Sequence, residues 1–327
     1  MIFACKNCGG NSLYDPEHQK MHCPYCDGMD SEEERKAETM SVCPSCGAPL
    51  EVGEVDIAQK CANCGNYNIF EERITGEYRP HLILPFVMGR EKIKEILQQE
   101  FGKKVFLPDS FLSETKLQTI EGIYVPFWLY DLDADMDYEG KGTQVRVWTA
   151  GEMEYTETSY FNVSRQMKIQ FTKIPVDASL KMEDGIMDLM EPYQYDALSE
   201  FKEKYLSGFM GEIYSQNGEE LEGRAASKAE LDTENLLHNS IQGYQSITPV
   251  RKEFHTETKS KDYALMPVWK YDYGYRGKTY PFHINGQTGK IVGDTPISYG
   301  KMSAYSLTVF LGTMALIRLV FSILEVL

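Results

Sequence analysis

The sequence predicts a mixed α+β protein, and three observations support this class. All eight cysteines lie in Cys-x-x-Cys pairs within the first 64 residues, tyrosine-rich stretches with alternating apolar residues fill the middle of the chain, and a 22-residue apolar stretch covers residues 303–324. The hydrophobic content of 42% and the charged content of 25% are typical of a folded chain. A length of 327 residues allows two or three domains, at least one of them with a substantial core.

The cysteines form two units with identical spacing. Each unit holds two Cys-x-x-Cys pairs separated by fourteen residues, and the second unit begins 38 residues after the first. A tight Cys-x-x-Cys turn supplies two of the four ligands of a tetrahedral zinc ion, and the gap between pairs has the length of a β-hairpin, so each unit predicts a zinc ribbon. The eight predicted ligands are Cys5, Cys8, Cys23, Cys26, Cys43, Cys46, Cys61 and Cys64.

We therefore predict zinc ribbon 1 at residues 1–30, a charged linker at 31–42 and zinc ribbon 2 at 43–75, with two zinc ions per chain. The repeat favours sequential ligation within each unit, and cross-bracing of alternate pairs is the alternative. Rubredoxin-type iron, redox thiols and disulfides are the other interpretations of the pairs. No apolar signal peptide precedes Cys5, which favours a reducing cytosolic environment and hence bound metal.

The charge of the ribbons indicates a protein partner rather than a nucleic acid. The chain carries 33 basic and 49 acidic residues, and residues 1–75 alone carry six basic against thirteen acidic side chains. A ribbon that reads nucleic acid needs a basic surface, because contacts of Lys and Arg with phosphates supply the affinity. Four thiolates also fill the coordination shell of zinc, so the predicted sites are structural rather than catalytic.

An amphipathic helix is predicted at residues 89–104, at the start of an α+β body that extends over residues 79–300. Gly102 is suited to end this helix as its C-cap. The apolar side chains that share one helical face are Ile93, Ile96, Leu97 and Phe101.

The remainder of the body predicts mostly strands, because apolar and polar residues alternate along it. Residues 123–148 predict a strand, a turn at 139–142 and a second strand. A more helical stretch covers residues 183–243. Further strands are predicted at residues 154–163, 166–174 and within 263–292.

A second, shorter repeat lies inside the body. The motif Pro-x-Trp-x-Tyr-Asp occurs at residues 126–131 and again at residues 267–272. Aromatic side chains at every second position share one face of a strand. We therefore predict a two-lobed, strand-rich body with two related sheet lobes and additional helices.

Other patterns that could carry chemistry are better explained by structure. The alternating aspartates of residues 131–137 lack the glycine and glutamate of a calcium loop and predict the solvated face of a strand. The stretch DYGYRGKT, residues 272–279, lacks the first glycine of a phosphate-binding loop and predicts a hairpin turn. Because the chain contains neither a His-Glu-x-x-His nor a Gly-x-Ser-x-Gly motif, we predict that it is not an enzyme.

The C-terminal tail, residues 303–327, predicts a transmembrane helix. Its 22-residue apolar stretch contains one charge and would measure about 33 Å as a helix, enough for a hydrocarbon core of about 30 Å. The alternative is a buried helix of a soluble protein. A span in this place predicts a single-pass anchor in the cell membrane, with the N-terminal bulk in the cytoplasm and Lys290 and Lys301 on the cytoplasmic side.

Arg318 is the one obstacle to insertion. An arginine near the centre of a span costs roughly 2.5–3.5 kcal/mol, whereas the apolar residues from Leu307 to Leu324 together contribute roughly 4–7 kcal/mol. Insertion is therefore favoured. The guanidinium is predicted either to pair with an acidic residue on the helix of a partner or to extend to the lipid headgroups.

The order of these segments resembles a known bacterial family. Paired cysteine units precede LILPFVMGREKIKEILQQEFGKKVFLPDSF, then EGIYVPFWLYDLDADMDYEGKG, then FHINGQTGKIVGDTPIS and the apolar tail. This arrangement is similar to membrane proteins labelled as transcription-factor-IIB-type zinc-ribbon proteins, sometimes also as relatives of a primosomal helicase. The resemblance covers nearly the whole chain, and it implies that the eight cysteines are the ribbon ligands.

The resemblance also implies partners, namely a stomatin- or flotillin-type protein and a phage-shock-type scaffold of an envelope-stress assembly. It does not extend to helicase activity, because the phosphate-binding loop is missing. The sequence thus predicts a non-enzymatic, membrane-tethered adaptor whose ribbons dock partner proteins. The alternative is a membrane-associated regulator whose ribbons bind nucleic acid or the transcription machinery.

Overall fold

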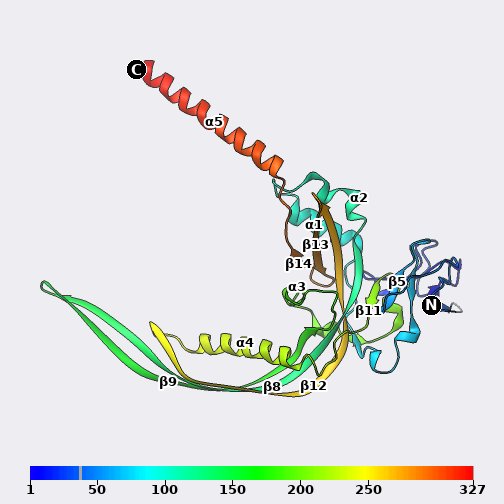
Figure 1. Cartoon of the computed structure of the whole chain (residues 1–327), viewed down its shortest axis with the longest axis horizontal. Coiled ribbons are helices and arrows are strands. Elements are labelled where there is room, and N and C mark those ends of the chain that lie inside the picture. Colours follow the sequence, from blue (N-terminus) through cyan, green and yellow to red (C-terminus); the bar gives the residue numbers. More distant parts are fainter. Residues whose placement is uncertain (37–38, 327) are drawn as a thin grey trace.

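The computed structural model of the chain describes residues 1–36 and 39–326, with side chains up to residue 323. The fold is a mixed α+β fold, as predicted. An N-terminal part rich in short strands packs on a curved sheet, three strands of the sheet continue outward as a long arm, and a C-terminal helix projects from the body (Figure 1). Residues 37–38 of the predicted linker and residue 327 of the predicted tail lie outside the described residues.

The first cysteine unit contains two small antiparallel sheets. Strand β1 pairs with β4, and β2 pairs with β3. Because β4 lies in the predicted charged linker, that segment is in part a strand whose backbone pairs with the N-terminus while its side chains stay exposed. The four strands are β1 (Ile2–Ala4), β2 (Leu13–Asp15), β3 (Lys20–His22) and β4 (Glu33–Arg35).

A single ten-stranded sheet connects the second cysteine unit with the body. Its main path runs β10-β7-β12-β8-β11-β5-β6, while β9 pairs with β8, and β13 joins β12 to β14. Strands β5 and β6 belong to the second unit, so this unit is continuous with the sheet of the body. The strands are β5 (Asp56–Lys60), β6 (Tyr67–Ile69), β7 (Leu82–Ile83), β8 (Glu121–Ala150), β9 (Met153–Asp177), β10 (Ser199–Glu200), β11 (Met210–Glu212), β12 (Ser246–Tyr275), β13 (Lys278–Asn285) and β14 (Ile291–Gly293).

The turn predicted at residues 139–142 is wrong, because β8 continues through it as one 30-residue strand. The chain turns instead at Gly151, whose φ of 65° suits a glycine. Along the supposed turn, β8 is paired with β9 on one side and β12 on the other, which satisfies its backbone groups. Gly142 makes room for an aromatic ring, since a Cβ there would lie 2.5 Å from the ring of Tyr244.

The sequence predicted that the two Pro-x-Trp-x-Tyr-Asp motifs belong to two separate sheet lobes, and this prediction is wrong. They lie on the neighbouring antiparallel strands β8 and β12 of one sheet. Val125 pairs with Met266, and the register around this pair relates the two motifs by a local twofold axis. This symmetry places Trp128 and Trp269 on the same face of the sheet, where both contact the largest apolar core.

Helix α1 (Arg90–Phe101) covers that core and confirms the predicted amphipathic helix, which Gly102 follows. Its buried apolar side chains pack against an aromatic cluster in which Phe86 stacks on Phe209 with ring centroids 4.2 Å apart. The short helix α2 (Glu114–Leu117) and five 3-10 helices complete the connections. The 3-10 helices span Glu71–Arg73, Gly76–Tyr78, Asp109–Leu112, Tyr195–Ala197 and Glu203–Leu206.

Gly122 is a closely packed glycine of this core. A Cβ at Gly122 would lie 2.5 Å from the ring of Phe209 and 3.3 Å from that of Phe86, so Gly122→Ala must displace the ring of Phe209. We expect the free energy of unfolding to fall by about 1–3 kcal/mol, the usual cost of overpacking. Gly223→Ala is the matched control, because nothing lies within 4 Å of its Cβ and alanine favours the helix. Equal stability of the two variants in denaturant titrations would contradict this packing.

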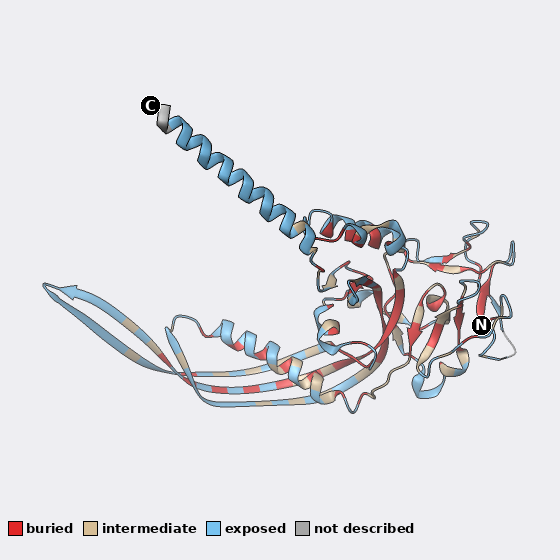
Figure 2. Cartoon of the chain, turned by 45° about the horizontal axis from the view of Figure 1, so that its top comes forward, coloured by how far each residue is buried: buried red, intermediate tan, exposed pale blue. Residues whose placement is uncertain are grey.

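The arm is supported by helix α4 (Glu222–Ser240), which confirms part of the helical stretch predicted at 183–243. Ala225 and Ala229 of α4 pack on Tyr130 and Leu132 of β8. The stretch also contains α3 (Asp184–Leu189), along with strands β10 and β11 that were not predicted. Figure 2 shows the buried residues under α4 and the exposed strands beyond it. The alternating aspartates of 131–137 lie on the more solvated face, as predicted.

A buried carboxyl group stands where β9 meets α4. Asp177 is fully buried, and one of its oxygens has no hydrogen-bond partner among the described residues. Burial raises the pKa of Asp177 to about 7, although Arg224 at 3.4 Å opposes the shift. Because the folded pKa exceeds the unfolded one, the protonated carboxyl stabilises the fold at low pH, and this contribution is lost as the pH rises from about 4 to 7.

Asp177→Asn should therefore gain stability relative to the unmodified chain as the pH rises. Between pH 5.5 and 8 we expect the difference in unfolding free energy to grow by about 2 kcal/mol in favour of the variant. Arg224 keeps two other carboxylate partners, Asp184 and Asp188, so the substitution does not isolate its charge. Denaturant titrations of both proteins at the two pH values measure this change, and a pH-independent difference would show that Asp177 is ionised throughout.

Helix α5 (Tyr299–Val326) ends the described chain and projects from the body (Figure 1). Its first turns contact the body, since Lys301 Nζ lies 2.5 Å from Asp109 Oδ1 and Tyr305 packs edge-on against Phe106. No part of the span Tyr299–Ile323 is buried against the body. The tail is therefore not a buried helix of the body.

Candidate metal centres and membrane helix

The eight cysteines form two separate four-sulfur groups, Cys5/8/23/26 and Cys43/46/61/64. The sulfur atoms within each group lie within 4.8 Å of one another. This arrangement is the sequential pairing that the repeat favoured, and cross-bracing of alternate pairs is excluded for this structure. All eight are free of disulfide bonds.

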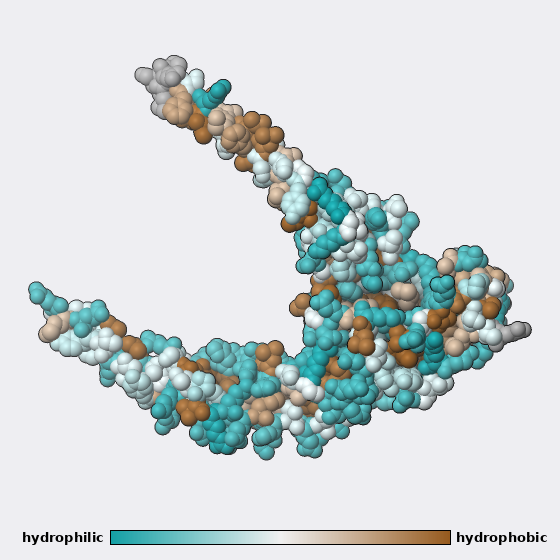
Figure 3. All heavy atoms as spheres, viewed as in Figure 1, coloured by the Kyte–Doolittle hydropathy of each residue, from teal (hydrophilic) through white to brown (hydrophobic). Residues whose placement is uncertain are grey.

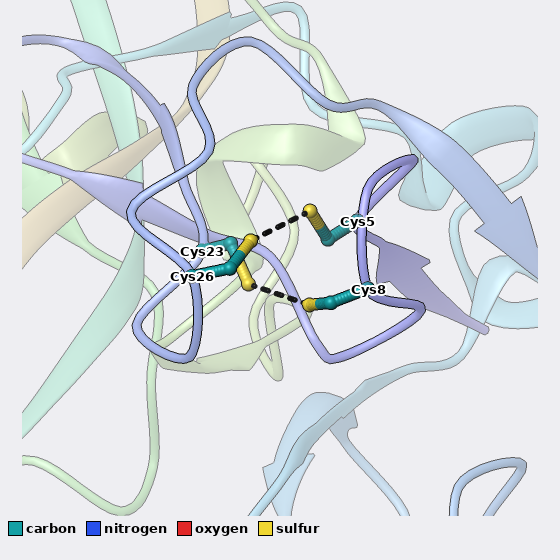
Figure 4. Close-up of side chains that lie close together, drawn as sticks. All are labelled: Cys5, Cys8, Cys23 and Cys26. Carbon is teal, nitrogen blue, oxygen red and sulfur yellow. Dashed lines mark hydrogen bonds between the residues drawn. The ribbon is translucent and has the colours of Figure 1, made fainter.

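The sulfur separations match a tetrahedral metal site. In the first group, Cys5 lies 3.6 Å from Cys26 and Cys8 lies 3.5 Å from Cys23, as Figure 4 shows. The corresponding separations in the second group are 3.7 and 3.8 Å. A metal–sulfur distance of about 2.3 Å in a regular tetrahedron gives sulfur–sulfur edges of about 3.8 Å. A disulfide would need about 2.05 Å, so both groups fit a metal ion and neither fits a disulfide.

All four Cys-x-x-Cys turns share one backbone arrangement. The residue after the second cysteine has a positive φ and donates its N–H to the carbonyl of the first cysteine. Glycine occupies this position in three turns, as the sequence suggested, and Asp27 occupies it in the fourth with a φ of 56°. Aspartate tolerates this conformation better than most residues, so the fourth turn keeps the same form.

Nearby N–H groups lower the pKa of one thiol in each group, whereas the pKa of Cys26 and that of Cys64 are raised to about 12. The backbone N–H groups of Cys8 and Asn7 lower the pKa of the Cys5 thiol to about 6. In the second group, the side-chain amide of Asn63 donates to Cys46 Sγ at 3.5 Å and, with the N–H of Ala48, lowers the pKa of that thiol to about 6. Because thiolates are the species that bind metal, Cys5 and Cys46 are the ligands that these N–H groups favour in the metal-binding form.

The four thiolates leave no position for a substrate. Each group would complete a tetrahedral shell, whereas catalytic zinc keeps one ligand position open for water. His22 lies outside the first group and contacts Asp27 with its Nε2 at 3.3 Å. Within the described residues, both centres therefore have the composition of structural sites.

The two cysteine units, which are called the metal units below, are both docked on the body and do not hang from it by flexible linkers. The backbone N–H of Tyr14 in the first unit donates to the carbonyl of Ser207 at 2.8 Å, and the hydroxyl of Ser207 donates to the carbonyl of Ser12. The ring of Tyr14 packs edge-on against Tyr205. The second unit shares the ten-stranded sheet through β5. No local sequence pattern signals the contacts of the first unit, because its partners on the body lie about 190 residues away along the chain.

Helix α5 is long and apolar enough to cross a membrane. Tyr299–Ile323 has a mean hydropathy of 1.9, and none of this span is buried against the rest of the protein. Figure 3 shows the apolar surface along the projecting helix. Arg318 lies toward the distal end of α5 with an exposed side chain, and no described residue forms an ion pair with it.

The comparisons with known proteins found one related sequence. The chain is 33% identical over 329 residues to the Bacillus subtilis (strain 168) protein described as uncharacterized protein YdjG, and the match covers 97% of this chain and 96% of that relative. No family model matches the chain. No solved structure matches it either.

Proposed function

This chain belongs to the family of the Bacillus subtilis protein YdjG, and on that premise we propose that it is a non-enzymatic, membrane-tethered adaptor. Two structural zinc centres form its docking head, and α5 anchors that head at the membrane. One observation carries the proposal. The two four-cysteine groups lie on one side of the body, and an exposed apolar helix leaves the body on another side (Figure 1).

Zinc is the proposed metal at both centres. Four thiolates at tetrahedral separations suit zinc, and such a closed site contributes folding energy rather than chemistry. Around the second four-cysteine group itself, the apolar core is the small cluster of Leu50 and Phe70 beside Cys43 and Cys61. A metal crosslink therefore supplies stability that so small a core cannot.

The orientation of the anchor follows from the residues at the base of α5. Lys290 and Lys301 precede the apolar stretch of residues 303–324, in which Arg318 is the one charged residue. An excess of basic residues marks the cytoplasmic side of a membrane helix. Tyr305 and Phe106 stand at the base of the helix, where aromatic rings favour the membrane interface. The body and its thiolates thus face the cytoplasm.

The proposed partners are proteins, and the resemblance of the sequence suggests a stomatin- or flotillin-type protein and a phage-shock-type scaffold. The charge balance supports protein partners, since residues 1–75 carry thirteen acidic against six basic side chains. An acidic head repels nucleic-acid phosphates, whose binding depends on Lys and Arg.

A pull-down from detergent-solubilised membranes tests the adaptor function. The full chain is compared with a chain that ends at Met302, which keeps the contact of Lys301 with Asp109. We expect the full chain to recover membrane-associated partners and the shortened chain to lose them. Recovery of the same partners from the same fraction would refute the tethering role. DNA binding at low salt that weakens steeply as salt rises would support the nucleic-acid regulator instead.

A further inference from the structure

A cleft opens where the two metal units meet the body, and we name it the junction cleft. Its volume is about 330 Å³. Tyr14 of the first unit, Tyr67 of the second unit, and Phe209 and Trp269 of the body form its apolar wall. The cleft is therefore complete only when both metal units are folded and docked.

Polar groups at this cleft lack partners. Only 4% of Tyr14 is exposed, and its buried hydroxyl has no hydrogen-bond partner among the described residues. The Nε of Arg90 is likewise buried and without a partner. Leaving a buried donor without an acceptor costs about 1–3 kcal/mol of stability. A ligand that supplies an acceptor would therefore be stabilised by both groups.

Arg90 is one of two cations that line the cleft, and the other, Lys60, lies 3.7 Å from a carboxylate oxygen of Glu121. The guanidinium of Arg90 donates to the hydroxyl of Tyr67 at 3.5 Å but forms no ion pair with a carboxylate of the described residues. Arg90 is also the first residue of the twelve-residue helix α1, and Gly89 before it supplies no side-chain cap. The free N–H groups of the first turn therefore add a positive partial charge at the edge of the cleft.

Together, these donors are suited to bind a carboxylate. A guanidinium, a phenol hydroxyl and a helix N-terminus are groups that bind carboxylates with charge-assisted hydrogen bonds. The apolar wall beside them requires that the carboxylate be carried by an apolar group. Three wall positions are glycines, Gly65, Gly89 and Gly208, which leave space for a peptide backbone to approach.

We propose that the junction cleft binds the C-terminus of a partner peptide, with an apolar last side chain against the aromatic wall and the terminal carboxylate at Arg90. The volume of about 330 Å³ holds one large side chain and its carboxylate rather than a complete lipid chain. Capture of a terminal carboxylate by backbone N–H groups is a known mode of peptide recognition. This inference deepens the proposed docking function and rests on it, since it assigns the part of the partner that is recognised.

The test measures peptide binding to the purified full chain in detergent micelles, loaded with two metals. The probe is a fluorescein-labelled Gly-Ser-Gly-Ser-Phe peptide with a free carboxylate, and its C-terminal amide is the matched control. We expect fluorescence anisotropy to show at least tenfold tighter binding of the free acid, as one charge-assisted hydrogen bond provides. Equal binding of the two peptides, or no binding of either, would overturn the proposal.

Two variants assign the carboxylate to the proposed donors. Arg90→Gln should remove the preference for the free acid, whereas Lys92→Gln should keep it, because Lys92 lies on the same helical turn but pairs with Glu95 outside the cleft. Tyr14→Phe deletes only the unpartnered hydroxyl and should weaken binding of the free-acid peptide several-fold. Metal content and tryptophan fluorescence confirm the fold of each variant. Equal effects of the Arg90 and Lys92 substitutions would overturn the assignment.

Octanoate is used as a second probe, to distinguish binding of a peptide C-terminus from binding of a free amphipathic acid. Octanoate that binds while neither peptide does would overturn the peptide assignment. The assay needs neither a membrane nor a natural partner, so its outcome is independent of tethering. Peptide binding without recovery of membrane partners would defeat the adaptor function and leave the cleft assignment intact.

Discussion

Replacement of Cys61 by serine is expected to remove one of the two metal ions and leave the first unit loaded. Serine does not replace a thiolate ligand, and an apparent binding energy of about 10–16 kcal/mol for structural zinc is largely folding energy. Cys61 follows β5 directly, and β5 pairs with both β6 and β11 of the sheet. Loss of this metal should therefore loosen residues 43–75 and the adjoining edge of the sheet. Elemental analysis and hydrogen exchange measure the two effects.

The reciprocal variant Cys23→Ser is the control for this prediction. It should lose the first metal, keep the second and leave β5 and β6 protected, because the two four-sulfur groups share no ligand. Loss of both metals in either variant would contradict separate sites. A red colour with strong visible absorption in the purified protein would identify iron in place of zinc, since zinc has no such transitions.

Local patterns predicted the parts of this protein whose geometry depends on neighbouring residues. The cysteine spacing identified both four-sulfur groups, because a tight turn brings two ligands together and the repeat indicates which turns belong together. The periodicity of Ile93, Leu97 and Phe101 identified α1. Residues 272–279 lack the first glycine of a phosphate-binding loop and were predicted to form a hairpin turn. This turn joins β12 to β13, and Arg276 and Gly277 adopt φ values of 53° and 77° there.

Features that depend on distant residues were not predictable in the same way. Gly140 and Gly142 looked like a turn, but pairing of β8 on both sides and contact with an aromatic ring explain them. The two Pro-x-Trp-x-Tyr-Asp motifs suggested two lobes, because a sequence repeat does not reveal whether related strands pair with each other. The junction cleft combines Tyr14, Tyr67 and Trp269, which no local pattern connects.

Deletion of residues 303–327 is expected to move the protein from the membrane fraction to the soluble fraction. None of Tyr299–Ile323 is buried against the body, so in water this helix would expose apolar side chains along its whole length. Insertion gains roughly 4–7 kcal/mol from these residues against roughly 2.5–3.5 kcal/mol for the arginine. The shortened chain keeps Lys301 on Asp109, so the body should remain folded. Alkaline extraction of membranes followed by immunoblotting measures the shift.

Arg318→Leu separates anchoring from partner recognition in the same assay. Removing the charge favours insertion by about 3 kcal/mol, so this variant must stay in the membrane after alkaline extraction. If Arg318 pairs with an acidic residue on a partner's helix, the variant should also lose that partner in the pull-down, whereas an arginine that only reaches lipid headgroups predicts unchanged recovery. Full-length protein that is soluble and monodisperse without detergent would refute the anchor altogether, because so exposed an apolar helix cannot remain dispersed in water.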